Sequence, residues 1–533
     1  MTPESPQGSI YEAFLNRVNE RPDADFIYSP KAPNGSAFTF AEVNQISLAL
    51  ANYYLDAGIT AGEKVILHLP NTPDFLFTFL ALQRLGAVPI MALAAHRFTE
   101  LSHFIKTSDA VAYIGFWRNL AVRNKQTLER LAESFPALKL FNIDAKAEVG
   151  QVQPSAAELF KLPTLRTDFP FPASADLALL QLSGGSTGLS KLIPKTHFQY
   201  LLTAQYSVAA GDFSSADTYL VALPAAHNFP LVSPGIMGAI TTGARLVFAL
   251  APSPDVCLPL IKTYGVTYTS LVPAVLLTWL QSALNEDFGD TLRIVQVGGS
   301  KCPPSSAEQV APVLGSTLQQ MFGMAEGMIA CTRIDDPIEA IVNSQGRPIH
   351  PDDEILIVDD NDTPLPTGEA GHLLVRGPYT LTAYYNAPEH NQTSFTTTGF
   401  YRTGDVVLQR PDGNLVVCGR QKDQINRGGE KISATEIEEL ILRHSAVSDV
   451  VLVAVPDEFL GEKSCALVVV KPEALGNLTP EEIQGFVRQS DVAAFKVPDQ
   501  VKLVAELPLT AVGKISKQQL RSRLASEILK SEV

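Results

Sequence analysis

Leu182–Lys191, with the sequence LSGGSTGLSK, is the stretch from which the rest of the chain can be interpreted. It follows Leu177–Leu180, an apolar run that is typical of a buried strand. Its glycines allow main-chain N–H groups to approach an anion closely, and its serines, threonine and lysine add donors and positive charge. The stretch therefore predicts a loop that binds a triphosphate.

Two other interpretations of this stretch have to be weighed, and one of them stays open. A Walker A loop requires glycine directly before the lysine, whereas Ser190 precedes Lys191 here. A surface turn is the other alternative, because turns rich in glycine and serine are common. The remainder of the chain has to decide between a phosphate loop and an ordinary turn.

The composition excludes several classes of protein. At 533 residues the chain is too long for a single core and predicts two or more domains. The net charge of −15 argues against nucleic-acid binding and favours a small-molecule or protein partner. The five cysteines lack the spacing of a metal site, as expected of reduced thiols in a cytoplasmic protein. Neither a signal peptide nor a membrane span is predicted, because no basic start precedes an apolar run and no uncharged stretch approaches about 18 apolar residues.

Strands and helices alternate on both sides of the loop. Thr39–Glu42 (TFAE) has the pattern of a capping box, and apolar residues follow it at helical spacing. Such alternation predicts parallel sheets that helices cover on both faces. Polar or glycine-rich turns follow expected strands at Pro224–Pro230, Gly298–Lys301 and Phe322–Gly327. Because ligands gather beyond the carboxyl ends of parallel strands, these turns and the loop predict one shared site.

The pattern changes over residues 348–417, where short strands and Gly, Pro or Asp turns predict an antiparallel sheet or barrel. Gly419–Glu430 is polar and rich in glycine, which makes it the best candidate for a linker. Ser433–Glu436 then has the pattern of a helix cap, and we expect a compact α+β unit from there onwards.

Four motifs occur in a fixed order along the chain. They are Leu180–Gly188 (LQLSGGSTG), Ala226–Asn228 (AHN), Leu318–Gly327 (LQQMFGMAEG) and Asp423–Lys431 (DQINRGGEK). Together they resemble the adenylate-forming superfamily of acyl- and aryl-CoA synthetases, luciferases and peptide-synthetase adenylation domains. Within it the chain is most similar to stand-alone aryl-acid AMP ligases of siderophore biosynthesis, the 2,3-dihydroxybenzoate-AMP ligases. It departs from their pattern at Ser190, where many members have proline, at Phe229, where tyrosine is frequent, and in a shorter N-terminal segment.

The resemblance implies an α/β fold in two domains. A large N-terminal domain of stacked αβαβα layers, with a small barrel-like subdomain, would span residues 1–421 and form the adenylation core. A small, mobile α+β domain would span residues 422–533 and carry the catalytic lysine.

The resemblance also implies a two-step reaction with ATP and Mg²⁺ as cofactors. A carboxylate attacks the α-phosphorus of ATP and displaces pyrophosphate, and a thiol then attacks the acyl-adenylate and releases AMP. Negative charge gathers around phosphorus in the first transition state. Catalysis therefore depends on positioning and on cationic stabilisation, and it requires no protein nucleophile.

The residues implied to bind ATP come from both domains. Glu326 would bind Mg²⁺, and Phe322 would pack against adenine. Asp405 would bind the ribose hydroxyls, and Arg420 would contact the nucleotide. The complete set is Ser183, Gly184, Gly185, Ser186, Thr187, Gly188, Lys191, Gly299, Phe322, Gly323, Glu326, Asp405, Arg420 and Lys514.

The resemblance implies that two lysines of the C-terminal region serve different half-reactions. Lys514 matches the catalytic lysine of the family, which would lie between the carboxylate and the α-phosphate. Lys422 matches the hinge residue about which the C-terminal domain turns. Such a motion would withdraw Lys514 after the first step and keep water from the reactive anhydride.

The aryl acid would lie beside the AHN turn, with His227 as a second catalytic residue near the carboxylate and Asn228 reading the 2-hydroxyl and the carboxylate. The remaining walls would be Phe229, Ser233, Gly298, Gly299, Met328 and Ile329. Ser233 favours 2,3-dihydroxybenzoate, because its hydroxyl can bond a ring hydroxyl. Ile329 is larger than the valine usual in dihydroxybenzoate ligases and favours salicylate. One added methylene discriminates between acids less sharply than a directional hydrogen bond does. We expect 2,3-dihydroxybenzoate first and salicylate second.

Three functions follow as alternatives. The first is an aryl-acid AMP ligase that loads the phosphopantetheine thiol of an aryl carrier protein supplied in trans. The second is an aryl-CoA ligase with coenzyme A as acceptor. The third, a non-catalytic adenylate-binding protein, is disfavoured because Lys191, Glu326, Asp405, Arg420 and Lys514 are all present. No nucleic-acid or membrane partner is expected.

Overall fold

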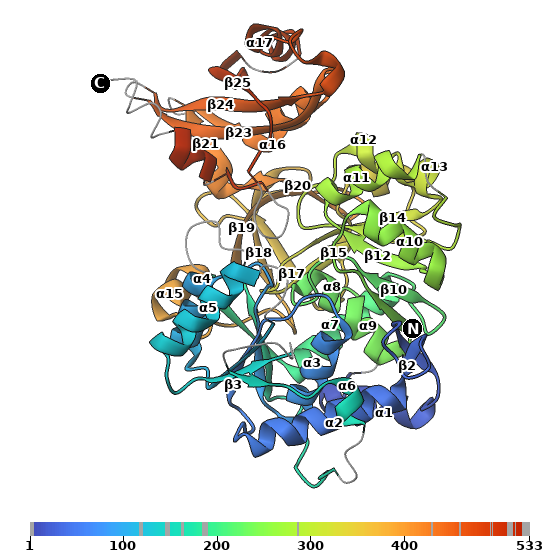
Figure 1. The fold of residues 1–533 in the computed structure, drawn as a ribbon. Helices are drawn as coiled ribbons and strands as arrows, with labels where there is room; N and C mark the ends of the chain where they lie inside the picture. The colour runs from blue at the N-terminus through green and yellow to red at the C-terminus, as the bar shows by residue number, and fades with distance from the viewer. Residues whose placement is uncertain are drawn as a thin grey trace. The chain divides into compact units, whose positions relative to one another are not determined.

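The computed structural model describes residues 5–116, 121–143, 150–160, 165–183, 190–284, 287–427, 430–457, 460–490, 492, 494–508, 515–517 and 519–524. The chain divides into two compact units, Met1–Glu354 with Arg376–Tyr401, and Ile355–Val375 with Arg402–Val533 (Figure 1). None of the helices in the described part of the chain combines the length and the apolar character needed to span a bilayer. The predicted domain boundary at residues 421 and 422 concerns a motion and stays a prediction.

The first unit contains a seven-stranded sheet in the described residues, in the order β7-β6-β5-β3-β4-β8-β9. Its strands are β3 (Lys64–Leu67), β4 (Val88–Met91), β5 (Ala112–Gly115), β6 (Lys139–Asn142), β7 (Gln151–Val152), β8 (Leu177–Leu182) and β9 (Leu192–Thr196). All pairs are parallel, as predicted, except β8 with β9. Only a short loop joins those two strands, and a parallel pairing would need a long crossover. The predicted phosphate loop therefore lies between two neighbouring antiparallel strands in the sequence.

A second sheet of this unit has nine strands in the described residues, in the order β16-β15-β14-β13-β12-β10-β11-β1-β2. The strands are β1 (Asp25–Tyr28), β2 (Ala37–Thr39), β10 (Thr218–Val221), β11 (Arg245–Phe248), β12 (Tyr268–Leu271), β13 (Ile294–Val297), β14 (Thr317–Gly323), β15 (Ile329–Cys331) and β16 (Arg347–Pro348). The strands from β14 to β1 are parallel, and the outer strands β15, β16 and β2 are antiparallel. Both sheets thus have the predicted parallel centre. The first has an antiparallel edge strand, β9, and the second has antiparallel pairs at both edges.

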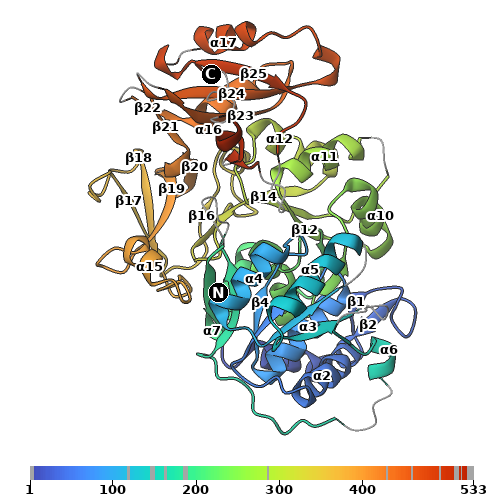
Figure 2. The ribbon, with the colours of Figure 1, turned by 60° about the vertical axis from the view of Figure 1, so that its left-hand side comes forward.

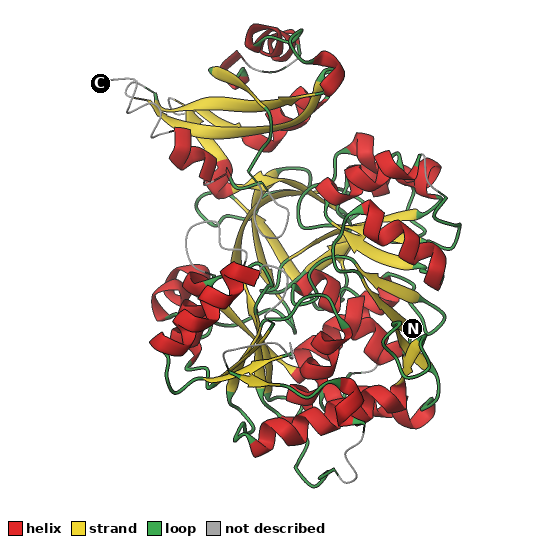
Figure 3. Cartoon of the chain, in the orientation of Figure 1, coloured by secondary structure: helices red, strands yellow, loops and turns green. Residues whose placement is uncertain are grey.

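Helices fill the space between the two sheets and cover their outer faces (Figures 2 and 3). One core cluster joins Val65 of β3 and Tyr219 of β10 to α1 (Ile10–Glu20), α2 (Phe40–Asp56), α3 (Pro73–Leu85), α7 (His197–Ala210) and α9 (Gly235–Thr242). A second cluster packs α4 (Phe98–Ser108) and α5 (Ala121–Ser134) on the seven-stranded sheet. A third packs α10 (Pro254–Tyr264), α11 (Pro273–Ala283) and α13 (Val310–Leu314) on the nine-stranded sheet. These clusters confirm the predicted αβαβα layers.

Short helices complete this unit: α6 (Ala156–Leu159), α8 (Asn228–Val232), α12 (Pro304–Ala307), α14 (Ile338–Asn343) and α15 (Pro388–Ser394).

Local signals placed α2 correctly and could have placed α1. Thr39 accepts a hydrogen bond from the Glu42 N–H at the start of α2, as the capping box predicts. Ser9 and Glu12 form the same box at α1, and Ile10 and Phe14 lie buried behind it. The capping pattern and the helical spacing of apolar residues were thus sufficient to predict α1 as well.

The second unit contains a four-stranded sheet in its described part, in the order β17-β18-β19-β20, and a larger sheet in the order β22-β21-β24-β23 with β25 beside β24. The strands are β17 (Glu354–Val358), β18 (Ala370–Arg376), β19 (Tyr401–Gln409), β20 (Leu415–Arg420), β21 (Gln424–Arg427), β22 (Glu430–Ser433), β23 (Val447–Asp457), β24 (Gly461–Val470) and β25 (Gln500–Val504). Apolar side chains of α16 (Ala434–Leu442) and α17 (Pro480–Gln489) join the core of the larger sheet. The expected linker differs from the prediction in part, because its residues 424–427 form β21 and pair with β22.

Candidate active site

The base of the predicted phosphate loop is closed by two hydrogen bonds. The Ser183 N–H donates to the Lys191 carbonyl at 3.0 Å, and the Lys191 N–H donates to the Ser183 hydroxyl oxygen at 2.9 Å. The strands β8 and β9 hold these two residues side by side. The predicted loop residues Gly184, Gly185, Ser186, Thr187 and Gly188 lie outside the described residues.

Tyr384 joins the predicted phosphate lysine to the predicted magnesium ligand. The Lys191 ammonium lies 4.6 Å from the centroid of the Tyr384 ring, within the range of a cation–π contact. The Tyr384 hydroxyl donates to Glu326 Oε1 at 2.9 Å and lies 2.9 Å from the Tyr401 hydroxyl. Burial, followed by the Glu326 charge, raises the pKa of Tyr384 far above its ordinary value, so this hydroxyl stays a donor. Lys191 and Glu326 therefore share one neighbour, as a shared site requires.

The turn that carries Glu326 depends on a glycine. Gly327 has a φ of 140°, and a Cβ there would lie 2.3 Å from the Thr380 Cα. Only a residue without a side chain fits this approach. The Leu381 N–H donates to the Glu326 carbonyl at 2.7 Å and ties the same turn down from the other side.

Lys195 is a buried cation beneath this turn, with 4% of its surface exposed. Its ammonium donates to the Tyr379 carbonyl at 2.7 Å and more weakly to the Glu326 carbonyl at 3.4 Å. Burial lowers the pKa of Lys195 from 10.5 to about 7, although the Glu326 carboxylate opposes the shift. The lysine thus places a positive or easily protonated group inside the unit.

A small cavity, called the inner cavity below, lies next to Lys195. Its lining includes Lys195, Tyr200, Asn228, Gly327, Ile329 and Tyr379. Of the predicted acid-binding residues, the lining includes Asn228 and Ile329. It does not include His227, Phe229, Ser233, Gly298, Gly299 or Met328.

Two of those residues lie together and two others are buried elsewhere. A Cβ on Gly298 would lie 3.2 Å from the Phe229 ring, so the glycine makes room for that ring. Ser233 ends α8 and is buried, and Met328 is buried with a φ of 55°. Their predicted contact with the acid stays a prediction.

His227 and Asn228 open helix α8. The His227 Nδ1 accepts a hydrogen bond from the Phe229 N–H at 3.2 Å and so caps the helix. The Tyr200 hydroxyl donates to the Asn228 Oδ1 at 2.6 Å, and the Gln181 amide donates to the Tyr200 hydroxyl at 3.0 Å. Asn228 is therefore held from behind by two buried side chains.

Phe322 and Gly323 end strand β14, directly before the Glu326 turn. Phe322 is half-buried, and Gly323 is exposed. Gly299 has a φ of 86°, in the region that favours glycine. An aromatic ring flanked by glycine at strand ends is compatible with the predicted nucleotide contacts, which stay predictions.

The second unit brings together two more predicted ATP ligands. Asp405 of β19 pairs in register with Arg420 of β20, and the Arg420 Nε lies 2.9 Å from the Asp405 Oδ1. The Asp405 N–H donates to the Thr403 hydroxyl at 3.0 Å, which restrains the main chain before the carboxylate. The side chain of Lys422 and all of Lys514 lie outside the described residues.

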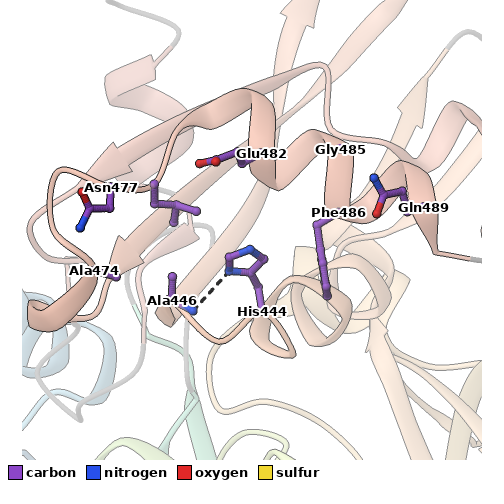
Figure 4. A pocket seen from close by; sticks show the side chains of 9 residues that line it. His444, Ala446, Ala474, Asn477, Glu482, Gly485, Phe486 and Gln489 are labelled. Atoms are coloured by element: carbon purple, nitrogen blue, oxygen red, sulfur yellow. Dashed lines mark hydrogen bonds between the residues drawn. The ribbon is translucent and has the colours of Figure 1, made fainter.

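The second unit also has a groove of about 420 Å³. His444 and Phe486 line it with ring centroids 5.0 Å apart, and the His444 Nδ1 accepts from the Ala446 N–H (Figure 4). None of the predicted site residues lines this groove. It therefore plays no part in the site that the sequence predicts.

Comparison with protein families agrees with this arrangement of motifs. Residues 14–385 match the family described as AMP-binding enzyme, and residues 436–514 match the AMP-binding enzyme C-terminal domain. The chain belongs to this family. The match covers Lys191, Tyr384 and Glu326 in one region and ends at Lys514 in the other.

Individual AMP-binding enzymes are similar to the chain over most of its length. The 2,3-dihydroxybenzoate-AMP ligase of Bacillus subtilis (strain 168) is 44% identical over 92% of the chain and 90% of the relative. A salicylyl-CoA synthase / salicylate adenylyltransferase of a Streptomyces species is 44% identical over 91% of the chain and 88% of the relative. The apo structure of Mycobacterium smegmatis MbtA is 40% identical, with a TM-score of 0.73 over 97% of this chain and 95% of that one.

Sequence reasoning missed four residues of this site: Gln181, Lys195, Tyr200 and Tyr384. Gln181 lies inside the LQLSGGSTG motif, so its position was a usable signal. The polar groups of the other three contact residues that are distant in the sequence, or far main-chain carbonyls. No spacing rule could have found those contacts.

Proposed function

We propose that the protein activates an aryl acid by adenylation and transfers the aryl group to the phosphopantetheine thiol of an aryl carrier protein in siderophore biosynthesis. The observation that carries the proposal is the position of the Glu326 turn. Its main chain borders the inner cavity at Gly327, and its carboxylate accepts from Tyr384 beside Lys191. The cavity has a volume of about 10 Å³, room for about one water, so an acid would have to widen it on binding. An acid bound there and a triphosphate at Lys191 would approach one another across this turn.

The residues present suit a reaction that proceeds by positioning and charge. Lys191 and the loop before it would hold the β- and γ-phosphates, and Asp405 and Arg420 would hold the ribose and the rest of the nucleotide. The acid's carboxylate would then attack the α-phosphorus, and pyrophosphate would leave. Loss of a preorganised cation from such a site is costly, because it stabilises charge that develops at phosphorus.

Mg²⁺ fits the residues of this site. The Glu326 carboxylate is buried, with 8% of the residue's surface exposed, and the described residues contain no group of three or more His, Cys, Asp or Glu side chains that could enclose a metal. Mg²⁺ typically binds one or two carboxylates together with waters and substrate phosphates rather than a full protein cage. Glu326 would hold the ion, which would neutralise phosphate charge.

The preferred acid belongs to the same proposal. Ser233 favours 2,3-dihydroxybenzoate and Ile329 favours salicylate, and the directional hydrogen bond outweighs the soft steric contact. We rank 2,3-dihydroxybenzoate above salicylate. The similarity to a 2,3-dihydroxybenzoate-AMP ligase and to a salicylate adenylyltransferase supports this pair of candidates.

Coenzyme A is the second candidate for the thiol acceptor. The similarity to a salicylyl-CoA synthase favours it specifically, because that relative matches the chain as closely as the AMP ligase does. Both acceptors present a phosphopantetheine thiol, so the chemistry of the second step is common to them.

Two measurements test these proposals. ATP–pyrophosphate exchange across a panel of benzoic, aliphatic and amino acids should be strong with 2-hydroxybenzoic acids and weak with the others. Exchange with acetate or phenylalanine alone would refute the substrate class. Product analysis with a phosphopantetheinylated aryl carrier protein and with coenzyme A then separates the two acceptors. Thioester formation on coenzyme A alone would refute the carrier protein as the acceptor.

A further inference from the structure

Gln181, Tyr200 and Asn228 form a chain of hydrogen bonds that ends at the inner cavity. Gln181 and Tyr200 are buried, and Tyr200 and Asn228 line the cavity. The Gln181 Nε2 lies 3.3 Å from the Ala226 carbonyl oxygen and 3.0 Å from the Tyr200 hydroxyl, which lies 2.6 Å from the Asn228 Oδ1. The first contact in this chain is to a main-chain group, whose chemistry is unambiguous.

The direction of each hydrogen bond follows from that main-chain group. A carbonyl oxygen only accepts, so the nitrogen of the Gln181 amide must face Ala226. The same NH₂ group then donates to the Tyr200 oxygen. Burial raises the pKa of Tyr200 well above its ordinary value, so the hydroxyl keeps its proton and donates it onwards to the Asn228 Oδ1. The amide oxygen of Asn228 is thereby engaged, and its NH₂ group has no hydrogen-bond partner among the described residues.

We propose that Gln181 and Tyr200 are positioning residues that hold the Asn228 NH₂ group toward the acid and so make the pocket select 2-hydroxy over 2-amino benzoic acids. This inference rests on the proposed aryl-acid function. Lys195 lines the same cavity, but its ammonium already donates to the Tyr379 and Glu326 carbonyls. The NH₂ group of Asn228 is therefore the donor that the described residues leave available to a ligand. An NH₂ group with unused hydrogens favours ligand groups that accept.

The two ortho substituents differ in what they present to a donor. The hydroxyl hydrogen of a 2-hydroxybenzoate bonds internally to the carboxylate, which leaves oxygen lone pairs directed outwards. A 2-amino group keeps an N–H directed outwards, and its lone pair is delocalised into the ring. Opposite the Asn228 NH₂ group, the hydroxyl oxygen accepts a hydrogen bond, whereas the amino group sets two donors against each other. A site built for one hydrogen-bonding pattern rejects the other strongly.

The test compares kcat/KM in ATP–pyrophosphate exchange for salicylate, 2-aminobenzoate and benzoate. We expect the wild type to prefer salicylate over 2-aminobenzoate by on the order of 100-fold. Tyr200→Phe releases the Asn228 oxygen, so the amide can turn and accept from an amino group. The preference should then fall by about tenfold, with a smaller fall in the ratio of salicylate to benzoate. Gln181→Met should act in the same direction, because Tyr200 loses the donor that orients its hydroxyl.

Tyr54→Phe is the matched control. Tyr54 is also a fully buried tyrosine whose hydroxyl donates to a side-chain amide oxygen, that of Gln153. This variant removes an equivalent hydrogen bond away from the cavity lining and should leave the ratios among the three acids unchanged. If Tyr200→Phe unfolds, Gln181→Met carries the comparison alone.

The outcomes separate this inference from the proposed function. Equal losses of kcat/KM for all three acids in Tyr200→Phe and Gln181→Met would show a merely structural role for the two residues. That result would overturn their positioning role and leave the proposed aryl-acid activation intact. Absence of exchange with every benzoic acid in the wild type would overturn both. The inference is supported if the kcat/KM preference for salicylate over 2-aminobenzoate falls in Tyr200→Phe and Gln181→Met while the kcat/KM ratios among the three acids stay unchanged in Tyr54→Phe.

Discussion

Tyr384 shows how one uncharged side chain can organise two charged ones. Its ring lies 4.6 Å from the Lys191 ammonium, and its hydroxyl donates to Glu326 at 2.9 Å. Long side chains lose conformational freedom when they bind a ligand, and contacts that restrict them beforehand lower that cost. Tyr384 therefore prepares both Lys191 and Glu326 for the phosphates and the metal that we propose they bind.

Replacing Tyr384 by phenylalanine should weaken MgATP binding while keeping the ring beside Lys191. A hydrogen bond to a charged group contributes roughly 1.5–3 kcal/mol, so we expect the KM for MgATP to rise by about tenfold or more. Exchange measured over a range of ATP and Mg²⁺ concentrations gives this value. Tyr385→Phe is the control, because the neighbouring ring contacts Lys64 instead. An equal KM in both variants would contradict the role of Tyr384.

Lys195 should make stability depend on pH. Burial lowers the pKa of Lys195 to about 7 in the folded protein, against an ordinary value of 10.5. Between these values the unfolded chain binds the proton and the folded protein does not. The free energy of unfolding should therefore rise with pH from about 7 to 10.5, by at most about 1.4 kcal/mol per unit.

Lys195→Met removes the titrating amine, so the variant is the reference against which the pH dependence of the wild-type free energy of unfolding is measured. Urea unfolding of both proteins at pH 7, 8 and 9 should show the wild type gaining stability relative to the variant as the pH rises. Other groups titrate equally in both proteins, so the difference isolates Lys195. Curves that run parallel over this range would show that Lys195 keeps the same charge in both states.

At the scale of elements, the site is built on turns that follow strands. The predicted phosphate loop lies between β8 and β9 in the sequence, and the Glu326 turn follows β14. Strand positions are set by buried apolar residues and by pairing with neighbours, so the Glu326 turn, directly after β14, inherits a well-defined position. Capping groups do the same for helix α8, where His227 closes the first turn beside Asn228.

Gly327→Ala should disrupt the turn that carries Glu326. The added Cβ would lie 2.3 Å from the Thr380 Cα, a main-chain atom that cannot turn aside as a side chain can. We expect a loss of about 1–3 kcal/mol in the free energy of unfolding and a larger loss of exchange activity.

Gly368→Ala separates the clash from backbone strain. Gly368 also has a positive φ, 95°, but no atom lies within 4 Å of its added Cβ. Thermal and urea unfolding of the two variants, with exchange rates, gives the comparison. Similar losses in both variants would mean that strain alone, rather than the contact with Thr380, accounts for the requirement.

At the scale of the whole molecule, each compact unit holds its own set of proposed ligands. Lys191, Glu326 and Asn228 belong to the first, and Asp405 and Arg420 belong to the second. A reaction in two steps can use a mobile C-terminal domain such as the predicted residues 422–533, because the domain can bring different residues to a fixed substrate in each step. We therefore propose that Lys514 serves the first step and Lys422 the change to the second.

Variants of these two lysines should separate the half-reactions. Lys514→Ala should reduce ATP–pyrophosphate exchange on the order of 10²–10³-fold, since a preorganised charge is lost, and should spare transfer from a pre-formed acyl-adenylate. Lys422→Pro should do the reverse, because proline restricts the backbone at the proposed hinge. Equal damage to both half-reactions in both variants would refute this division.

Much of the fold could be predicted from the sequence, and the predictions that were wrong failed for physical reasons. Capping patterns located α2 and α16, because these signals depend on residues only three or four positions apart. The polar segment 419–430 was expected to be a linker, yet its residues 424–427 pair as β21. Strand pairing with a distant partner can override a local preference for turns.

The sequence by itself determined the alternation of buried strands and helices, the glycine-rich turns after those strands and the chemical types available there. These features are local, since each depends on periodicity, capping or backbone freedom within a few residues. Only the tertiary structure decided that Tyr384 would meet Lys191 and Glu326, that Lys195 would lie under the Glu326 turn, and that Gln181 and Tyr200 would stand behind Asn228. Those contacts join residues from distant parts of the chain, because sheet order and layer packing, rather than any sequence interval, set the distances between them.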